Sequence, residues 1–368
     1  MAVEPLESIY THSVPRMLAE LGASVLVTTY QAGRLVILRT DPRTGELNSH
    51  FRAFGKPMGL AIEPGRMALG TTAEIWEFHD IPGMRGRLAK EGEPASDGAF
   101  LPRCVHFTGD IQVHEMAWVK EPGGAAAGGP SRLWFVNTRF SCLAVRSGIY
   151  SFEPTWKPGF ITGLAPEDRC HLNGMCAREG VPRYVTALGR TDVAGGWRAN
   201  KASGGILMDI VSGEIVAEGL SMPHSPRWHD GKLWVLDSGN GGLGIVDATG
   251  HYQEVCRLPG FTRGLDFVGP YAFVGLSQVR ESATFSGIKI CELKPEERAC
   301  GMWVVDTRTG DVAGLVKFTN DVQEVFAVQV LTGARWPDVI NSDPALTAGA
   351  FELSPEALEQ VPLGHRAR

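Results

Sequence analysis

The strongest constraint on the fold of this chain is an internal repeat. The stretch HSPRWHDGKLWVLDS, which begins at residue 224, aligns without a large gap with RGLDFVGPYAFVGLS, which begins at residue 263. Each copy has a polar or otherwise distinctive first residue, an apolar strand, a turn containing glycine and a second apolar strand. The same outline recurs from residues 58, 114 and 173, and a sixth start, EVFAVQV, lies at residue 324. Such a repeat predicts copies of one small unit that pack side by side.

Two further strands follow in the copies. GIVDATGHYQEVCRL and WVVDTRTGDVAGLVKF are apolar runs joined by turns that contain Asp and Gly, as in β-hairpins. A single four-stranded sheet cannot bury both of its faces, whereas sheets packed radially around an axis cover one another and leave only short edges. We therefore predict an all-β fold, a six-bladed β-propeller of four-stranded antiparallel blades.

The two ends of the chain complement each other. The copy that starts at residue 324 lacks its later strands, and residues 24–53 look like later strands without a first one. The ring is therefore predicted to close by pairing of N-terminal strands with the C-terminal inner strand. Residues 1–23 would be a peripheral segment with a short helix, 24–337 the propeller, and 338–368 a loosely held tail. The alternative of two β-sandwiches leaves both terminal fragments unexplained.

Charge and cysteine content exclude several classes of protein. The net charge is −6, and the 35 Lys and Arg residues are scattered, so nucleic acid is not an expected partner. The first 25 residues contain no long apolar run, which argues against a signal peptide or a membrane anchor and favours a cytoplasmic protein. Seven cysteines without a C-x-x-C pair suggest reduced thiols. Only Cys291 and Cys300, which bracket one loop, are candidates for a disulfide.

The repeat also predicts which residues lie at the hub. The innermost strand of each propeller blade runs along the central channel, so the first residues of the six copies should gather at one mouth of it. These are Met58, His114, Asn173, His224, Arg263 and Glu324. His171 precedes Asn173 by two residues and should point to the same side of its strand. The three histidines lie 57 and 53 residues apart, about one blade each.

Three histidines in register favour a metal site. Neutral imidazoles suit Zn, Cu, Fe or Ni, whereas Ca²⁺ prefers oxygen ligands, for which Asn173 and Glu324 are the main candidates here. We predict that His114, His171 and His224 bind a transition metal, with Zn, Cu and Fe undecided and Ca less favoured. The alternative is that these imidazoles only hydrogen-bond strand ends and water inside a wet channel.

Two charged hub residues are candidates for catalysis. Arg263 could hold a substrate carboxylate or a developing oxyanion, and Glu324 could transfer a proton. The alternative is that these two side chains neutralise each other in a salt bridge. Met58 is expected to pack in the channel rather than to bind a metal.

The loops that follow the second strands should surround the same mouth. Those at 189–205 and 277–301 are unusually long, and binding sites are often built from such loops. The residues predicted to contact a substrate are Asn173 at the hub and Arg139, Arg190, Asp192, Trp197, Arg198 and Arg280 in the loops. The glycine-rich loop at 119–131 should emerge at the opposite mouth and carry no chemistry.

Several motifs resemble a known bacterial family. They are HEMAW, LWFVNTRFSCL, APEDRCHLNGM, YVTALGRTDVAGGWRANKASGG, MPHSPRWHDGKLWVLDSG, LPGFTRGLDF and VQVLTGARWPDV. The family is one of conserved hypothetical proteins that are sometimes fused to tetratricopeptide repeats, and the resemblance covers nearly the whole chain. It implies a propeller fold and no established activity.

Two enzyme families resemble the predicted architecture more distantly. Peptidyl-α-hydroxyglycine amidating lyases are six-bladed propellers whose central zinc is held by three histidines beside a functional arginine. That resemblance implies His114, His171 and His224 as ligands and Arg263 as the arginine. This chain has no disulfide frame and no matching tyrosine on the axis, so the substrate of those lyases does not transfer. Gluconolactonases share the Asn-Gly strand start at residue 173, but their calcium site is rich in carboxylates.

Three functions follow from these expectations. The first is a metalloenzyme of lyase or oxidoreductase type that acts on a small molecule or a peptide end. The second is a calcium-dependent, lactonase-like hydrolase. The third is a propeller without catalytic activity that presents its loops to a protein partner.

Overall fold

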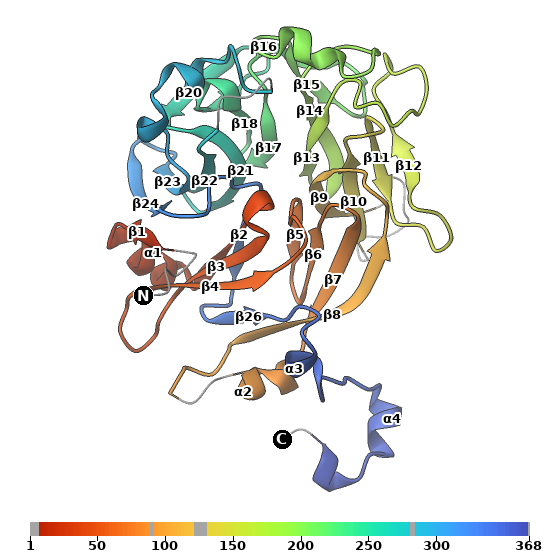
Figure 1. Ribbon diagram of the computed structural model, residues 1–368, viewed down its shortest axis with the longest axis vertical. Coiled ribbons are helices and arrows are strands. Elements are labelled where there is room, and N and C mark those ends of the chain that lie inside the picture. The colour runs from red at the N-terminus through yellow and green to blue at the C-terminus, as the bar shows by residue number, and fades with distance from the viewer. Residues whose placement is uncertain (1–6, 89–91, 121–130, 280–283, 367–368) are drawn as a thin grey trace.

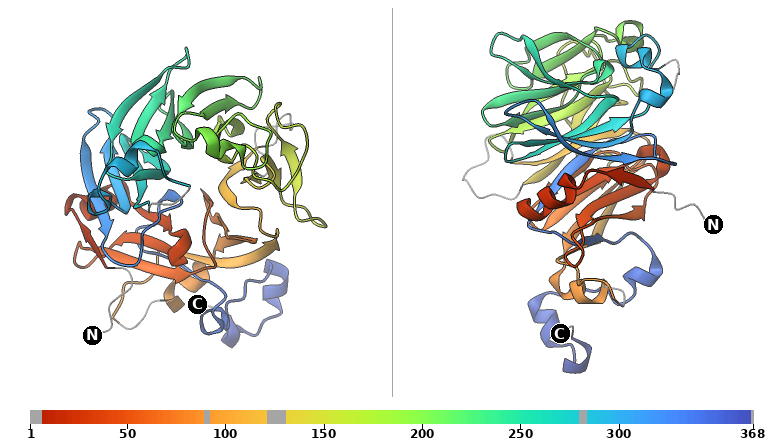
Figure 2. Two further views of the ribbon diagram at one scale, coloured as in Figure 1. Left: turned by 45° about the horizontal axis from the view of Figure 1, so that its top comes forward. Right: turned by 90° about the vertical axis from the view of Figure 1, so that its left-hand side faces the viewer.

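The strands form six small sheets that stand around a central axis (Figures 1 and 2). The computed structural model describes residues 7–88, 92–120, 131–279 and 284–366. Each sheet contains four antiparallel strands that meander outward from the hub, and two sheets carry one added edge strand. The predicted six-bladed β-propeller is therefore confirmed.

Five blades follow one another along the chain. Blade 1 contains β5 (Leu60–Glu63), β6 (Arg66–Gly70), β7 (Glu74–Asp80) and β8 (Gly98–Phe107). Blade 2 contains β9 (Val113–Val119), β10 (Arg132–Asn137), β11 (Cys142–Val145) and β12 (Glu153–Trp156). Blade 3 contains β13 (Leu172–Arg178), β14 (Val181–Ala187), β15 (Gly205–Asp209) and β16 (Ile215–Leu220). Blade 4 contains β17 (His224–His229), β18 (Lys232–Asp237), β19 (Gly242–Val246) and β20 (Tyr252–Arg257). Blade 5 contains β21 (Phe261–Val268), β22 (Tyr271–Ser277), β23 (Gly301–Asp306) and β24 (Val312–Phe318).

Blade 6 closes the ring from both ends of the chain. Its inner strand β25 (Val328–Thr332) pairs with β2 (Ala23–Thr28), which is followed by β3 (Arg34–Thr40) and β4 (Leu47–Ala53). The register places Val25 opposite Val330, so apolar side chains of the two chain ends lie next to each other. The closure predicted from the two incomplete copies is confirmed, although the inner strand begins four residues after Glu324.

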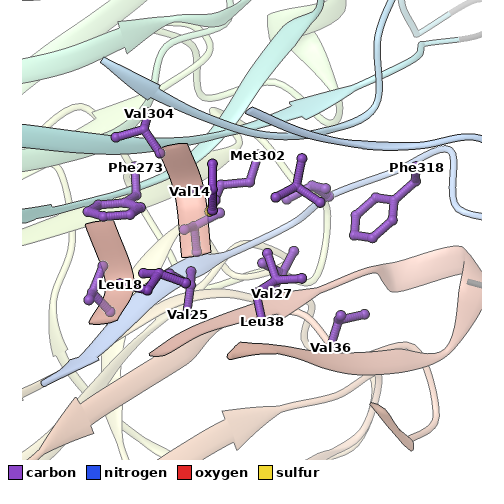
Figure 3. Packing of buried hydrophobic residues seen from close by; sticks show 14 of the residues in the cluster. Val14, Leu18, Val25, Val27, Val36, Leu38, Phe273, Met302, Val304 and Phe318 are labelled. Carbon is purple, nitrogen blue, oxygen red and sulfur yellow. The ribbon is translucent and has the colours of Figure 1, made fainter. Parts of the chain in front are cut away.

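The terminal segments add elements to the outside of the ring. Helix α1 (Ser13–Leu21) buries Val14 and Leu18 among side chains of blades 5 and 6, as Figure 3 shows for Val25, Phe273 and neighbouring residues. Strand β1 (Ser8–Tyr10) pairs with β24 at the edge of blade 5. The sequence pattern suggested only a helix in this segment.

The C-terminal segment remains part of the fold beyond residue 337. Strand β26 (Pro337–Val339) pairs in parallel with β8, and Ile340 is buried. Two short helices lie at this edge of blade 1, α2 (Arg85–Leu88) and α3 (Pro344–Thr347), and Leu88 and Leu346 pack on the same apolar cluster as Ile340. Helix α4 (Pro355–Glu359) stands farther from the ring (Figure 1). Ser354 caps α4 by accepting a hydrogen bond from the backbone of Ala357.

None of the seven cysteines, all of which lie in the described ranges, is part of a disulfide, so Cys291 and Cys300 do not form the one considered for them. Among the described residues, no helix has the length and apolar character needed to span a membrane.

Candidate functional site

The inner strands bring most of the predicted hub residues to one cavity. It has a volume of about 290 Å³ and lies at the mouth where the inner strands begin. The predicted residues that line it are Met58, His114, His171, His224, Arg263, Glu324, Trp197 and Arg198. Tyr30, Phe261, Phe285 and Phe326 add aromatic surface to the same cavity.

His114 and His224 are held by the same local motif in blades 2 and 4. In each, Nδ1 donates to the carbonyl oxygen two residues earlier, Gln112 at 3.0 Å and Met222 at 2.8 Å. Both carbonyl residues have positive φ, 56° and 47°, which turns the chain back toward the imidazole. A hydroxyl directly after the second strand of the blade also accepts from Nδ1, that of Thr138 after β10 and that of Ser238 after β18. Nε2 is thus the unprotonated nitrogen of each ring.

His171 differs because its partner is a carboxylate. Its Nδ1 lies 2.8 Å from Oδ1 of Asp168, and both residues have positive φ, 50° and 49°. The other oxygen of Asp168 accepts from Trp197 Nε1 at 3.0 Å and lies 3.4 Å from Arg198. The indole of Trp197 also packs on the imidazole, with ring centroids 4.6 Å apart. The long loop at 189–205 therefore fixes the Asp168–His171 pair from one side.

Burial keeps two of the three imidazoles neutral. It lowers the pKa of His114 well below the ordinary value, and the nearby His171 and Arg263 lower this pKa further. The pKa of His224 is lowered in the same way, mainly by burial and then by Arg263. At neutral pH both side chains can accept hydrogen bonds through Nε2 and carry no charge.

Arg263 supplies a positive charge to the cavity wall. Its guanidinium carbon lies 3.5 Å from the centroid of the Phe326 ring, so one face of the guanidinium is covered. Its Nε is buried and has no hydrogen-bond partner in the described parts of the chain. Burial lowers the pKa of Arg263 to about 10, while the charge of Glu324 acts in the opposite direction.

A buried ion pair ties together the strands that carry the histidines. Glu115, next to His114, accepts from Arg227 at 2.5 Å and from the backbone N–H of Met175 at 3.0 Å. These three residues belong to β9, β17 and β13, the inner strands of blades 2, 4 and 3. Burial raises the pKa of Glu115, and the positive charge of Arg227 opposes that shift.

Asn173 has a structural position rather than a place on the cavity wall. Its amide donates to the carbonyl of Pro223 at 3.0 Å, and its oxygen accepts from the Thr186 hydroxyl at 2.7 Å. It is 2% exposed. Asn173 therefore links blades 3 and 4 beneath the cavity, together with the Glu115–Arg227 pair.

The three imidazoles offer nitrogen donors of the kind that a metal ion needs. Each imidazole has Nδ1 engaged and Nε2 available, as metal-bound histidines do. The rings of His114 and His171 are close, with centroids 4.8 Å apart and planes at 87°. However, no three His, Cys, Asp or Glu side chains in the described part of the chain are arranged to hold one ion. As arranged, the three histidines do not fit the predicted three-ligand site.

The loop residues predicted to bind substrate divide into separate groups. Trp197 and Arg198 lie at the cavity, but Arg190 lines a different depression formed by its own loop. Asp192 binds Arg169 and Thr162, and Arg139 binds Asp110, so both serve surface networks. Arg280 and most of the glycine-rich loop at 119–131 lie outside the described residues.

Sequence reasoning missed Asp168, Tyr30 and Phe326. Asp168 could have been found, because it stands three residues before His171 in the quoted motif APEDRCHLNGM and has the right chemistry to orient an imidazole. Tyr30 lies in the loop after β2, where no repeat copy suggested a site residue.

Solved structures share the fold with this chain and little of its sequence. A chain of a nidogen/laminin complex is 11% identical over 85% of this chain and 99% of that chain, with a TM-score of 0.53. A protein of unknown function from Bacteroides caccae is 9% identical over 84% of this chain and 99% of that chain, with a TM-score of 0.50. Virginiamycin B lyase from Staphylococcus aureus is 11% identical over 85% and 99% of the two chains, and its TM-score of 0.38 is too low to bear on chemistry. These similarities show the fold alone.

Family membership comes from the sequence. Comparison with curated proteins finds no match. A family model, in contrast, matches residues 12–340, which include all six blades. This agrees with the resemblance of the quoted motifs to an uncharacterised family. The chain therefore belongs to the family described as Domain of unknown function (DUF4915).

Proposed function

We propose that the hub cavity is the active site of a lyase-type enzyme that acts by proton transfer on a small molecule or a peptide end. The observation that carries this proposal is the Asp168–His171 hydrogen bond of 2.8 Å on the wall of a concave site. A carboxylate that accepts from Nδ1 fixes the tautomer of the imidazole and stabilises its protonated form. His171 can then use Nε2 as a general base.

The other cavity residues take roles that suit this chemistry. In an elimination, Nε2 of His171 removes a proton from a substrate carbon, the C–H electron pair forms the new double bond, and the leaving group departs with its own electron pair. Arg263 holds the substrate and balances negative charge that develops on it. Glu324 is the second group for proton transfer, on the side of Arg263. The neutral His114 and His224 accept hydrogen bonds from substrate hydroxyl or amide groups.

A metal-dependent form of the same enzyme is the second candidate. It is favoured by one observation, that His114, His171 and His224 all have Nδ1 engaged and Nε2 available. A bound transition metal would act as a Lewis acid toward the substrate. This form requires the three imidazoles to converge on one ion, an arrangement that the described residues do not have in the structure.

The test uses purified protein, a panel of small organic acids and peptides in D₂O, and NMR detection of both new products and exchange of C–H for C–D. We expect one class of compound to react, and we expect His171→Gln and Asp168→Asn to lower the rate by about 10²-fold to 10⁴-fold. His251→Gln, at an exposed position, is the matched control and should react as the wild type does. Equal rates in all four proteins would refute the assignment of His171 as the base.

Metal analysis of the same samples separates the two forms. About one transition-metal ion per chain, lost in His114→Ala and His224→Ala, is expected for the metal-dependent form. Turnover by metal-free protein is expected for the form that uses only the side chains.

A further inference from the structure

We infer that the hub cavity binds a small monocarboxylic acid with an aromatic or flat apolar group, and that Arg263 binds its carboxylate. This inference deepens the proposed function, because it takes the hub cavity as the substrate site and names the class of substrate. It depends on the buried Nε of the Arg263 guanidinium, on the composition of the cavity wall and on the cavity volume.

The guanidinium of Arg263 has a buried nitrogen that lacks a hydrogen-bond partner among the described residues. Burial removes hydration from Arg263, and the charges of Glu324 and Glu115, which favour the cation, offset this loss only in part, because the pKa of Arg263 is still lowered. A ligand carboxylate supplies the missing partner through two parallel N–H···O bonds, which match the planar edge of a guanidinium.

Aromatic packing fixes the orientation of the Arg263 guanidinium. Phe326 covers one face of the guanidinium at 3.5 Å. The Phe326 ring is held in turn by His114 and Tyr30, with centroid distances of 5.0 Å and 5.8 Å. Stacking fixes the plane of the guanidinium, so its N–H groups are aimed before a ligand arrives. A fixed donor group loses less entropy on binding than a mobile one.

The charges on the cavity wall favour a ligand with a single negative charge. The described residues of the cavity wall include two cations, Arg263 and Arg198, and Arg198 lies 3.4 Å from the carboxylate of Asp168. His114 and His224 are neutral and present only an acceptor, so they cannot bind an anion. The described wall also includes the carboxylates of Asp168 and Glu324, which offer no binding group for a second anionic group on the ligand. One carboxylate fits this distribution of charge better than two do.

The aromatic side chains and the size of the cavity favour a small ligand with a flat apolar group. Five aromatic side chains line the cavity: Tyr30, Trp197, Phe261, Phe285 and Phe326. Aromatic rings favour contact with flat apolar groups through stacked and edge-to-face arrangements. The volume of about 290 Å³ limits the ligand to a small molecule.

The test measures binding of benzoate by calorimetry and by NMR. We expect benzoate to bind at least about tenfold more tightly than benzamide, which has the same shape without the charge, a difference of about 1.4 kcal/mol. Arg263→Gln should abolish this preference, and Arg263→Lys should restore only part of it, since an ammonium cannot form the paired bonds. Arg308→Gln, at an exposed arginine that pairs with Asp306, is the control and should bind as the wild type does.

Two further probes test the class of ligand. Acetate, which lacks the ring, and inorganic phosphate should both bind more weakly than benzoate. Equal binding of benzoate and benzamide, unchanged binding in Arg263→Gln, or tighter binding of phosphate would overturn the inference. His171→Gln should still bind benzoate, so a failure of the proton-transfer proposal is distinguishable from a failure of this one.

Discussion

The carboxylate of Glu115 in blade 2 lies 2.5 Å from the guanidinium of Arg227 in blade 4, with both side chains largely buried. Between them, the backbone of Met175 in blade 3 donates to the same carboxylate. This interaction spans the three blades that carry His114, His171 and His224. It therefore sets the spacing of the strands on which the candidate site depends.

Removal of Glu115 should leave the buried guanidinium of Arg227 without its closest carboxylate, with only the charge of Asp266 to compensate it in part. We expect Glu115→Met to lower the free energy of unfolding by about 3–5 kcal/mol, as measured by urea denaturation. The double variant Glu115→Met with Arg227→Met should recover most of this loss, because two apolar side chains of similar size can replace a buried pair. Arg308→Ala, at an exposed ion pair, should change the unfolding midpoint little. A double variant no more stable than the single one would contradict this view of the pair.

The buried histidines should make stability depend on pH. Their folded pKa values are lowered, so the unfolded state binds more protons between the two pKa values, and stability is lost as pH falls below the ordinary histidine pKa of 6.5. Each histidine should contribute a slope of up to about 1.4 kcal/mol per pH unit in the acid range. We expect His224→Asn to flatten the fall in unfolding free energy between about pH 6.5 and 5, whatever its effect at pH 8. An equally steep fall in His224→Asn and in the wild type would contradict the assignment of this pH dependence to the buried histidines.

Gly264 offers a test of how closely blades 5 and 6 approach. It has φ of 82°, and a Cβ there would lie 2.6 Å from the backbone nitrogen of Val328. Gly264→Ala should therefore destabilise the protein by at least about 2 kcal/mol, through backbone strain together with a steric clash. Gly269→Ala, at φ of 55° with no atom within 4 Å of the added Cβ, should show the strain alone, about 1 kcal/mol. Similar losses in the two variants would indicate that the clash is relieved by a shift of the chain.

Ring closure predicts which C-terminal truncation the protein tolerates. A chain ending at residue 350 keeps β25, β26 and the packing of Leu346 and Ala350, so its thermal midpoint should stay within a few degrees of the wild type. A chain ending at residue 326 lacks the inner strand of blade 6 and should show no cooperative unfolding by circular dichroism. Cooperative unfolding of the shorter chain would mean that five blades and an open ring are stable.

Sequence reasoning predicted the blades and the closure because both depend on local patterns. Alternating apolar residues, turns with Asp and Gly, and a regular repeat determine which segments form strands and in which order they lie. Equivalent positions in a closed ring must then face one axis, and for this reason His114, His171, His224, Arg263 and Glu324 line one cavity.

The partners of these residues could not be obtained in the same way. These contacts depend on distances between blades and on side-chain rotamers, which the packing of the whole ring sets. Examples are the ion pair of Glu115 with Arg227, the stacking of Arg263 on Phe326 and the ion pair of Arg169 with Asp192. The same holds for the spacing of the three imidazoles. The amino-acid sequence by itself determined that three histidines reach the hub, because register along the chain decides this. Only the tertiary structure decided that one of them has a carboxylate partner and that the buried Nε of Arg263 has no hydrogen-bond partner among the described residues, because those contacts join segments whose separation is a property of the folded ring.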